Sequence, residues 1–208
     1  MTKKDEILFD SRKFDLLFMK YLPNFTECLD KISIYSEKLF LYNKRHSLVS
    51  FNTVEEFFFK HVYDSLLPTL LCPTFFNAKE FLDIGSGAGI PGLILSICFP
   101  ESLWVLLEPK YKRVVFLEGL ILELGIKNVI VLQERLEDIR EIPEKVTSRA
   151  TFPLKKMISI LKDRRNLTLA LWLGKSFDSS VLNKLDYETF NYALPEKFGT
   201  RKFLLIKL

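Results

Sequence analysis

Residues 81–92 read Phe81-Leu82-Asp83-Ile84-Gly85-Ser86-Gly87-Ala88-Gly89-Ile90-Pro91-Gly92, and this stretch decides the fold. A short, mostly apolar run typical of a strand leads into four of the chain's eight glycines, and a helical pattern follows. Glycine permits positive φ and lets the backbone approach a bound molecule without a Cβ in the way. A simple tight turn would need only one or two glycines. The stretch therefore predicts a strand, a ligand-binding loop and a helix.

Short apolar runs alternate with helical patterns on the carboxyl side of this loop, which is the signature of βαβ units and a parallel sheet. We expect strands at 80–84, 103–107, 129–132, 145–149 and 167–173, with helices at 90–99, 110–124 and 155–161. Two further strands, at 187–193 and 202–208, flank a turn-like segment and predict a closing antiparallel hairpin. The fold class is therefore α/β, with a mostly parallel, seven-stranded, Rossmann-like sheet.

The first third of the chain reads as helices. Apolar residues recur at helical spacing between Phe25 and Lys44. A second helix should begin near Thr53, where Asn52 or Thr53 can cap it, and should end at Pro68. We expect residues 1–78 to form a helical extension packed on the core, and residues 79–208 to form the catalytic domain.

Composition narrows the function classes. Of 208 residues, 48% are hydrophobic and 27% are charged, and no apolar run reaches the ~18 residues that a membrane span needs. The charged start does not resemble a signal peptide, so we expect a cytoplasmic protein. The cysteines are odd in number and widely separated, and neither histidine is near one, which predicts buried thiols and no metal site. These residues are Cys28, Cys72, Cys98, His46 and His61.

The charge is unevenly distributed. Residues 1–78 hold ten basic and ten acidic side chains, whereas residues 79–208 hold 20 basic and 16 acidic ones. The basic surplus of the second part is compatible with an anionic partner.

Two cofactors compete for the glycine loop. Residues 87–92 satisfy the G-x-G-x-x-G pattern of NAD-binding oxidoreductases, and Glu108 follows about 20 residues later. Asp83 would repel a pyrophosphate but suits the ammonium of a methionine group, and Pro91 offers no N–H to a phosphate. These two features favour S-adenosylmethionine, the donor of class I methyltransferases, and an NAD(P) oxidoreductase is the alternative.

Three more residues are candidates for cofactor binding. Glu108 ends the second strand, where a carboxylate can accept both hydroxyls of a ribose; otherwise it is an acid at a helix start. Leu136 and Glu137 follow the third strand, where methyltransferases of this class commonly enclose the adenine. Leu136 could pack on the ring and Glu137 could face its amine, or Glu137 could be one of several exposed acids.

Five motifs, in the same order along the chain, resemble the ribosomal RNA small subunit methyltransferase G family, also called glucose-inhibited division protein B. The first precedes the loop and resembles R-H-I-x-D-S, the loop itself is nearly the family motif, and the others match K-R-x-x-F-L, S-R-A and the closing strand. They are Lys60–Ser65, Asp83–Gly92, Lys112–Leu117, Ser148–Ala150 and Arg201–Lys207. Two departures are Gly174-Lys175, which the family usually has in the opposite order, and Glu108, where Asp is usual.

The resemblance implies methylation of N7 of one guanine in 16S rRNA, with the rRNA or the small ribosomal subunit as partner. It also implies cofactor contacts by Gly85, Ile90, Leu136, Glu137 and Arg149, beside the loop glycine Gly87. We expect a monomer without a metal ion. A class I methyltransferase acting on another RNA or a small molecule, and a non-catalytic binding relative, are the alternatives.

Guanine N7 carries a lone pair and no proton, so this reaction needs no general base, and no histidine lies beside the loop in the sequence. Arg149 could hold the methionine carboxylate or a substrate phosphate, or form a salt bridge. His61, Asp64 and Ser65 share one helical face, which either lines the pocket or ties the extension to the core. RNA contact is predicted for eight basic residues: Lys110, Lys112, Arg113, Lys155, Lys156, Lys162, Arg164 and Arg165.

Overall fold

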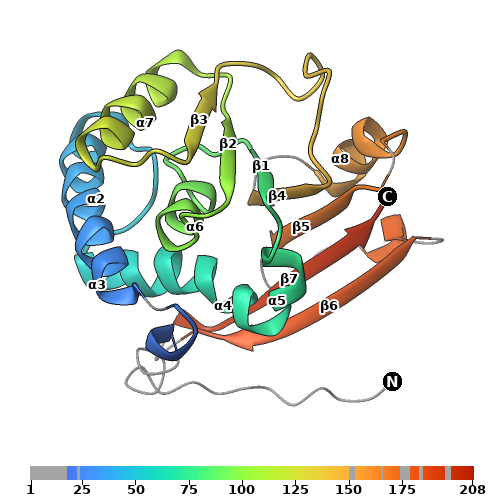
Figure 1. Ribbon diagram of the computed structural model, residues 1–208, viewed down its shortest axis with the longest axis horizontal. Helices are drawn as coiled ribbons and strands as arrows, with labels where there is room; N and C mark the ends of the chain where they lie inside the picture. The colour runs from blue at the N-terminus through green and yellow to red at the C-terminus, as the bar shows by residue number, and fades with distance from the viewer. Residues whose placement is uncertain are drawn as a thin grey trace.

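The computed structural model describes residues 18–22, 24–149, 153–164, 166–173, 179–182, 185–194 and 198–208. Its centre is a seven-stranded sheet in the order β3-β2-β1-β4-β5-β7-β6 (Figure 1). The first five strands in this order are parallel, and β7 runs antiparallel to both β5 and β6. The strands are β1 Glu80–Ile84, β2 Leu103–Leu107, β3 Val129–Leu132, β4 Lys145–Arg149, β5 Thr168–Leu173, β6 Asp186–Ala193 and β7 Thr200–Lys207. The predicted α/β fold, its parallel core and its closing antiparallel pair are confirmed.

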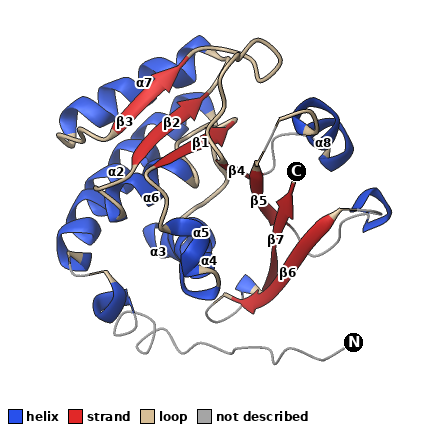
Figure 2. Cartoon of the chain, turned by 45° about the vertical axis from the view of Figure 1, so that its right-hand side comes forward, coloured by secondary structure: helices blue, strands red, loops and turns tan. Residues whose placement is uncertain are grey.

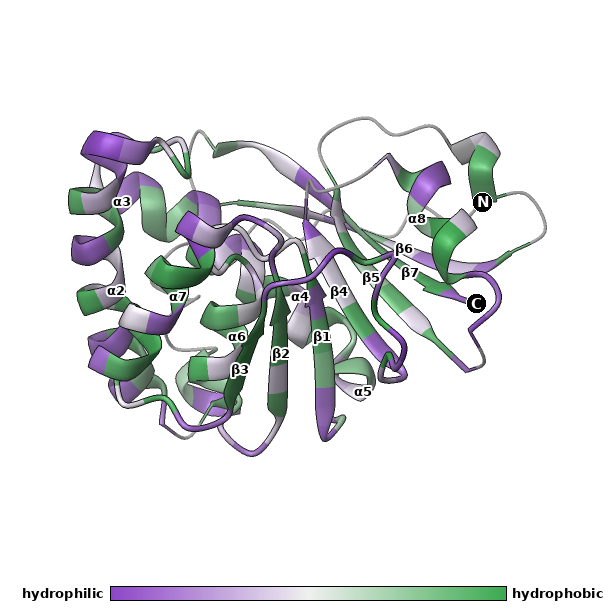
Figure 3. Ribbon diagram, turned by 90° about the horizontal axis from the view of Figure 1, so that it is seen from above, coloured by the Kyte–Doolittle hydropathy of each residue, from purple (hydrophilic) through white to green (hydrophobic). Residues whose placement is uncertain are grey.

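Helices cover both faces of the sheet because alternate strand residues point to opposite sides. Phe81 and Trp104 stack on one face, with 4.3 Å between their ring centroids. Leu82 and Ile84 belong to a second apolar cluster on the other face, together with residues of helix α8 (Leu154–Leu161). Figure 2 shows α6 (Gly92–Cys98) and α8 on opposite sides of the sheet. Figure 3 shows how hydrophobic β2 and β3 are along most of their length. The helices are α2 Phe25–His46, α3 Val54–Phe57, a π-helix Phe58–Tyr63, α4 Asp64–Leu71, α5 Pro73–Phe76, α6 Gly92–Cys98, α7 Tyr111–Glu123, α8 Leu154–Leu161 and a 3₁₀ turn Ser179–Leu182. None of the helices among the described residues is both long and apolar enough to cross a membrane.

The helices of the extension share one apolar cluster with α6 and with the strands beneath it. Three side chains of α2 also donate hydrogen bonds to backbone carbonyls of residues 79–208. The Tyr35 hydroxyl donates to the Ala88 carbonyl at 2.6 Å, inside the glycine loop, and the Tyr42 hydroxyl donates to the Lys112 carbonyl at 3.0 Å. The Cys28 thiol donates to the Ile97 carbonyl at 3.4 Å. The described helices of the extension therefore pack on the core, and Tyr35 touches the loop directly.

The predicted end of the second helix at Pro68 is wrong, because α4 continues to Leu71. Proline inside a helix leaves the carbonyl four residues earlier without its usual N–H donor. That carbonyl belongs to Asp64, and the buried indole N–H of Trp172 on β5 donates to it at 2.7 Å. The sheet thus supplies the hydrogen bond that Pro68 cannot, and the helix continues.

Candidate functional site

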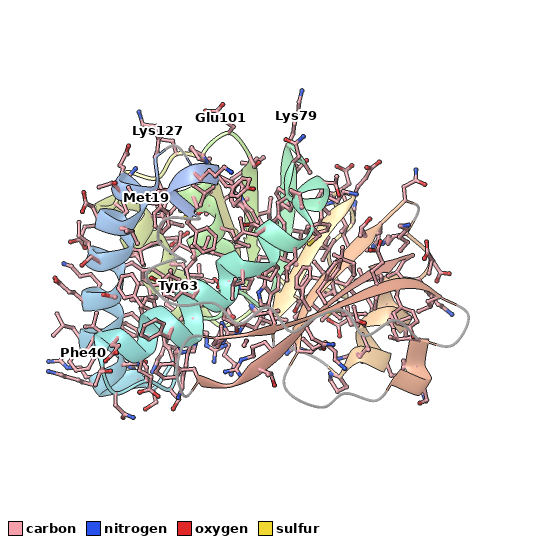
Figure 4. All side chains as sticks on the ribbon, turned by 90° about the horizontal axis from the view of Figure 1, so that it is seen from below. Met19, Phe40, Tyr63, Lys79, Glu101 and Lys127 are labelled. Carbon is pink, nitrogen blue, oxygen red and sulfur yellow. The ribbon has the colours of Figure 1, made fainter. Side chains whose placement is uncertain are left out.

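The carboxyl ends of the parallel strands form the edge of the sheet at which the site lies. Lys79, Glu101 and Lys127 precede β1, β2 and β3 and stand exposed at the other edge (Figure 4). The strand order reverses between β1 and β4, and in open α/β sheets ligands bind at the carboxyl ends of the strands at such a point. The glycine loop follows β1 at this position.

The loop has the left-handed backbone that its glycines predict. Gly85, Gly87 and Gly89 have φ of 69°, 61° and 98°. Gly92 is needed for a different reason, because a Cβ there would lie 2.5 Å from Oδ2 of Asp83. Close packing beneath the loop, and not ligand approach, therefore requires this last glycine.

Asp83 holds the loop from below. Its carboxylate is fully buried and accepts the Gly92 N–H at 3.1 Å and the Thr147 hydroxyl at 2.9 Å. Burial raises the pKa of Asp83 to about 6, while the hydrogen bonds that it accepts oppose this rise. Asp83 is not among the pocket-lining residues described below. The geometry therefore gives it the role of positioning the loop, and its predicted contact with an ammonium group has no support from this placement.

A pocket of about 630 Å³ opens beside the loop. Seven of the eight predicted site residues line it, and Asp83 is the exception. The lining combines glycine-loop residues, residues after β2, β3 and β4, and two segments of the helical extension. The lining residues are Leu48, Val49, His61, Gly85, Ser86, Gly87, Ala88, Ile90, Leu107, Glu108, Pro109, Lys110, Arg113, Arg135, Leu136, Glu137, Arg149 and Lys156.

Glu108 joins the loop to the second strand. Its side chain is only 2% exposed, and its two carboxylate oxygens accept the N–H groups of Gly87 and Lys110, each at 3.0 Å. Arg113 lies 3.4 Å from the same carboxylate. Oε2 accepts from both Gly87 and Arg113, whereas Oε1 accepts from Lys110 and keeps a second lone pair, so this buried group can still accept a hydrogen bond from a ligand hydroxyl in the pocket.

Leu136 and Glu137 form the wall of the pocket after β3. Leu136 is buried, whereas Glu137 is exposed and pairs with Lys156 of α8 at 2.9 Å. The hydrogen bond from Lys156 lowers the pKa of Glu137, which keeps it an acceptor at neutral pH. The arrangement offers an apolar surface beside a hydrogen-bonding edge, which suits a purine.

Arg149 ends β4 and connects the pocket to the extension. Its Nη2 donates to the Lys60 carbonyl at 3.1 Å and to Nδ1 of His61 at 3.0 Å, and it lies 3.3 Å from the Asp64 carboxylate. Asp64 also accepts the Tyr192 hydroxyl at 2.6 Å. The residues that share one helical face therefore divide their roles: His61 lines the pocket and Asp64 ties the extension to the sheet. The Ser65 hydroxyl donates to the His61 carbonyl within the helix.

His61 lines the pocket, which is one of the two roles expected for its helical face, although it lies far from the loop in the sequence. The π-helix Phe58–Tyr63 carries it to the pocket, and π-helical turns occur frequently at functional sites. A guanidinium only donates hydrogen bonds, so Nδ1 of His61 accepts from Arg149 and the ring is neutral with its proton on Nε2. Burial, reinforced by the positive charge of Arg149, lowers the pKa of His61 to about 3.

This shift predicts how acid affects stability. In the folded protein His61 binds its proton near pH 3, whereas in the unfolded chain it does so near 6.5. Its contribution is therefore fully present above pH 6.5 and is lost as the pH falls toward 3. Asp83 acts in the opposite direction, because its folded pKa of about 6 exceeds its ordinary 3.8. We expect the free energy of unfolding of the wild type, minus that of His61→Gln, to fall by up to about 1.4 kcal/mol per pH unit below pH 6.

Urea titrations at several pH values measure this difference, and taking the difference cancels the contribution of Asp83. The matched control is His46→Gln, because His46 is exposed at the end of α2. A difference for His61→Gln that does not change between pH 4 and 6.5 would show that the imidazole is not buried as described.

The predicted RNA-contacting residues occupy different positions. Lys110, Arg113 and Lys156 line the pocket, whereas Lys112, Lys155 and Lys162 are exposed and do not line it. Arg164 instead donates to the carbonyls of Ile139 and Arg140, at 2.9 and 2.5 Å, and thereby holds the segment after β3. Arg165, Ala150, Gly174 and Lys175 lie outside the described residues. Arg135 also lines the pocket and was missed, although it stands in the acid-rich segment after β3.

Comparison with known proteins shows the family of this chain. A family model described as rRNA small subunit methyltransferase G matches residues 28–190. Ribosomal RNA small subunit methyltransferase G of Campylobacter jejuni is 30% identical over 200 residues, which cover 94% of this chain and 98% of the relative. The protein of the same name from Wolinella succinogenes is 36% identical over 143 residues, covering 68% of this chain and 72% of the relative. Among solved structures, the METTL16 MTase domain has a TM-score of 0.54 at 13% identity, covering 66% of this chain and 64% of that chain. This last likeness shows the fold alone, which is that of class I methyltransferases.

Proposed function

Because the chain belongs to the rRNA small subunit methyltransferase G family, we propose that it transfers a methyl group from S-adenosylmethionine to N7 of one guanine in 16S rRNA. The observation that carries the proposal is the pocket itself. It brings the glycine loop, Glu108, the Leu136–Glu137 pair and Arg149 into one cavity at the strand-order reversal. The cofactor identity and the acceptor identity are supported by different features.

The cavity suits a nucleoside that carries an amino acid. The buried Glu108 carboxylate would accept the ribose hydroxyls, Leu136 and Glu137 would contact the adenine, and Arg149 would hold the methionine carboxylate. When bound, S-adenosylmethionine supplies an electrophilic methyl group on a sulfonium. The chain's own residues hold and orient the two reactants.

The loop is poorly suited to the pyrophosphate of NAD. A dinucleotide site uses free backbone N–H groups at the glycine loop and the helix start. Here the N–H of Gly87 donates to Glu108, that of Gly92 donates to Asp83, and Pro91 has none. The N–H groups of four more loop residues also donate to protein carbonyls: Gly85, Ser86, Gly89 and Ile90. The oxidoreductase alternative is therefore disfavoured.

Catalysis by this pocket rests on position and charge. N7 of guanine needs no deprotonation, so the neutral His61 imidazole is not required as a base. Holding the two reactants in line provides most of the acceleration that a displacement of this type requires. Four cationic side chains around the lining would hold phosphates of a polyanionic acceptor, which favours RNA over a small molecule. They are Lys110, Arg113, Arg135 and Lys156.

The acceptor is tested with small ribosomal subunits that lack this modification, incubated with labelled S-adenosylmethionine. Borohydride reduction and aniline treatment cleave RNA at 7-methylguanine, so the treated 16S rRNA should show one new strand break. Label at a carbon, an exocyclic amine or a ribose hydroxyl would leave the fold standing and refute the assignment. Repeated transfer of label from S-adenosylmethionine to the subunits would also exclude a purely binding role. In the cell we expect the protein to act in the cytoplasm, as a monomer and without a metal ion.

Replacing Glu108 by alanine should weaken binding of S-adenosylhomocysteine by about 1–3 kcal/mol, because two ribose hydroxyls lose their acceptor. Calorimetric titration gives the affinity directly. Glu118→Ala is the matched control, since Glu118 is exposed on α7 and does not line the pocket. If both variants bind equally well, Glu108 serves only to order the loop and the start of α7.

A further inference from the structure

The turn that joins α2 to α3 supplies part of the pocket wall. Leu48 and Val49 lie in this turn, are half-buried, and line the same cavity as the glycine loop. Among the described residues of the extension, the ones that line the pocket are Leu48, Val49 and His61. No motif in the sequence marks the two aliphatic residues, and the contacts inferred above for the cofactor do not involve them.

The turn is held in place by one side chain. The Oδ1 atom of Asn43 accepts the N–H groups of Leu48 at 2.7 Å and Val49 at 3.2 Å, and its amide donates to the Val49 carbonyl at 2.5 Å. Ser47 adopts left-handed φ and ψ of 44° and 52°, which turns the chain sharply at the end of α2. Three hydrogen bonds to one asparagine fix a turn that carries apolar side chains toward a cavity.

Aromatic packing supports the turn from behind. Phe51 is buried, and its ring centroid lies 5.1 Å from that of Phe57 and 6.3 Å from that of His61. The position of Leu48 and Val49 is therefore coupled to the same π-helical segment that places His61. Hydrogen bonds and aromatic packing thus hold this wall in place, and such support is what a site needs to orient a reactant.

We propose that Leu48 and Val49 form the wall against which the acceptor guanine packs. The inference rests on the proposed function and names the part of the chain that contacts the acceptor base. A purine presents a flat, weakly polar face, and aliphatic side chains cover such a face while excluding water. The wall carries no charge, so it does not oppose the positive charge that N7 gains as the methyl group arrives.

The competing occupant of this wall is the methionine part of the cofactor, and the experiment separates the two. Four variants are compared with the wild type: Leu48→Ser, Val49→Ser, Leu48→Met and Leu41→Ser. Leu48→Met conserves the volume of the side chain and should keep the apolar contact. Leu41→Ser is the matched control, because Leu41 is 58% exposed on α2 and does not line the pocket.

Two measurements are made on each variant. The first is kcat/KM for unmodified small subunits, which should fall roughly 10- to 100-fold in Leu48→Ser and Val49→Ser, as expected when apolar contact with a substrate is lost. The second is binding of S-adenosylhomocysteine and of a conjugate that joins the 5′ carbon of adenosine to N7 of guanine. The wild type should bind the conjugate more tightly than adenosine alone. The two serine variants should lose this gain and bind S-adenosylhomocysteine as the wild type does.

A parallel fall in affinity for S-adenosylhomocysteine would assign the wall to the cofactor and overturn the inference. Unchanged methylation and conjugate binding in both serine variants would also overturn it. If the wild type itself neither modifies guanine in small subunits nor gains affinity from the guanine of the conjugate, the proposed function fails and the inference fails with it. The wild type therefore distinguishes the two failures.

Discussion

Replacing Gly87 by valine should lower the affinity for S-adenosylhomocysteine by about 100-fold or more, because a branched side chain would occupy ligand space in the pocket. The protein should still fold. A Cβ at this position would have 3.7 Å to its nearest neighbours, Arg113 Nη1 and the Gly85 carbonyl. The left-handed φ of 61° adds a strain of about 1–3 kcal/mol for a β-branched residue.

A matched control separates strain from occlusion. Gly125 also has φ of 61°, a Cβ there would meet nothing within 4 Å, and it is not a pocket-lining residue. Gly125→Val should therefore lose comparable stability and bind normally. Calorimetric titration and thermal melting of both variants provide the comparison. Normal binding by Gly87→Val would mean that the loop is only a turn.

The second large effect concerns stability. Replacing Asp64 by alanine should lower the free energy of unfolding by about 3–5 kcal/mol, because it leaves the charge of Arg149 without its buried carboxylate and the Tyr192 hydroxyl without its acceptor. For a chain of this length the melting temperature should fall by roughly 6–20 °C. Tyr192→Phe, which removes one hydrogen bond of this group, should have a smaller effect of about 1–2 kcal/mol.

The control for this experiment is another aspartate in an ion pair. Asp186 pairs with Lys207 at 2.9 Å, but both side chains are largely exposed. Because exposed pairs contribute little to stability, Asp186→Ala should melt as the wild type does. Equal melting temperatures for Asp64→Ala and Asp186→Ala would show that the buried network does not stabilise the fold.

The part of the site that the sequence predicts is the part that a local pattern encodes. Gly85 and Gly87 stand in a strand–loop–helix pattern, and Glu108 ends the next apolar run, so the topology alone brings them to one edge. Strands β1 to β4 have the predicted bounds. The pattern is clearest for β2 and β3, which are short apolar runs between polar residues.

What the sequence does not predict depends on contacts between distant segments. Leu48 and Val49 lie in a turn without a recognisable motif, and only the folded extension brings them to the pocket. Asp83 was expected to face the ligand, but its side chain packs beneath the loop against Gly92 and Thr147. Which way one carboxylate points at the end of a strand is decided by such neighbours, and these are visible only in three dimensions.

The hydrogen bond from Trp172 to the carbonyl of Asp64 has a consequence for the order of folding. Pro68 has no N–H to donate to that carbonyl, so the carbonyl lacks this hydrogen bond until β5 is in place. Helix α4 therefore cannot reach its full stability early. Conversely, a chain that began at residue 79 would lack both the acceptor of the indole N–H and Phe76, whose ring centroid lies 6.4 Å from that of Trp172. One hydrogen bond between residues 108 positions apart thus links the stability of the helical extension to that of the sheet.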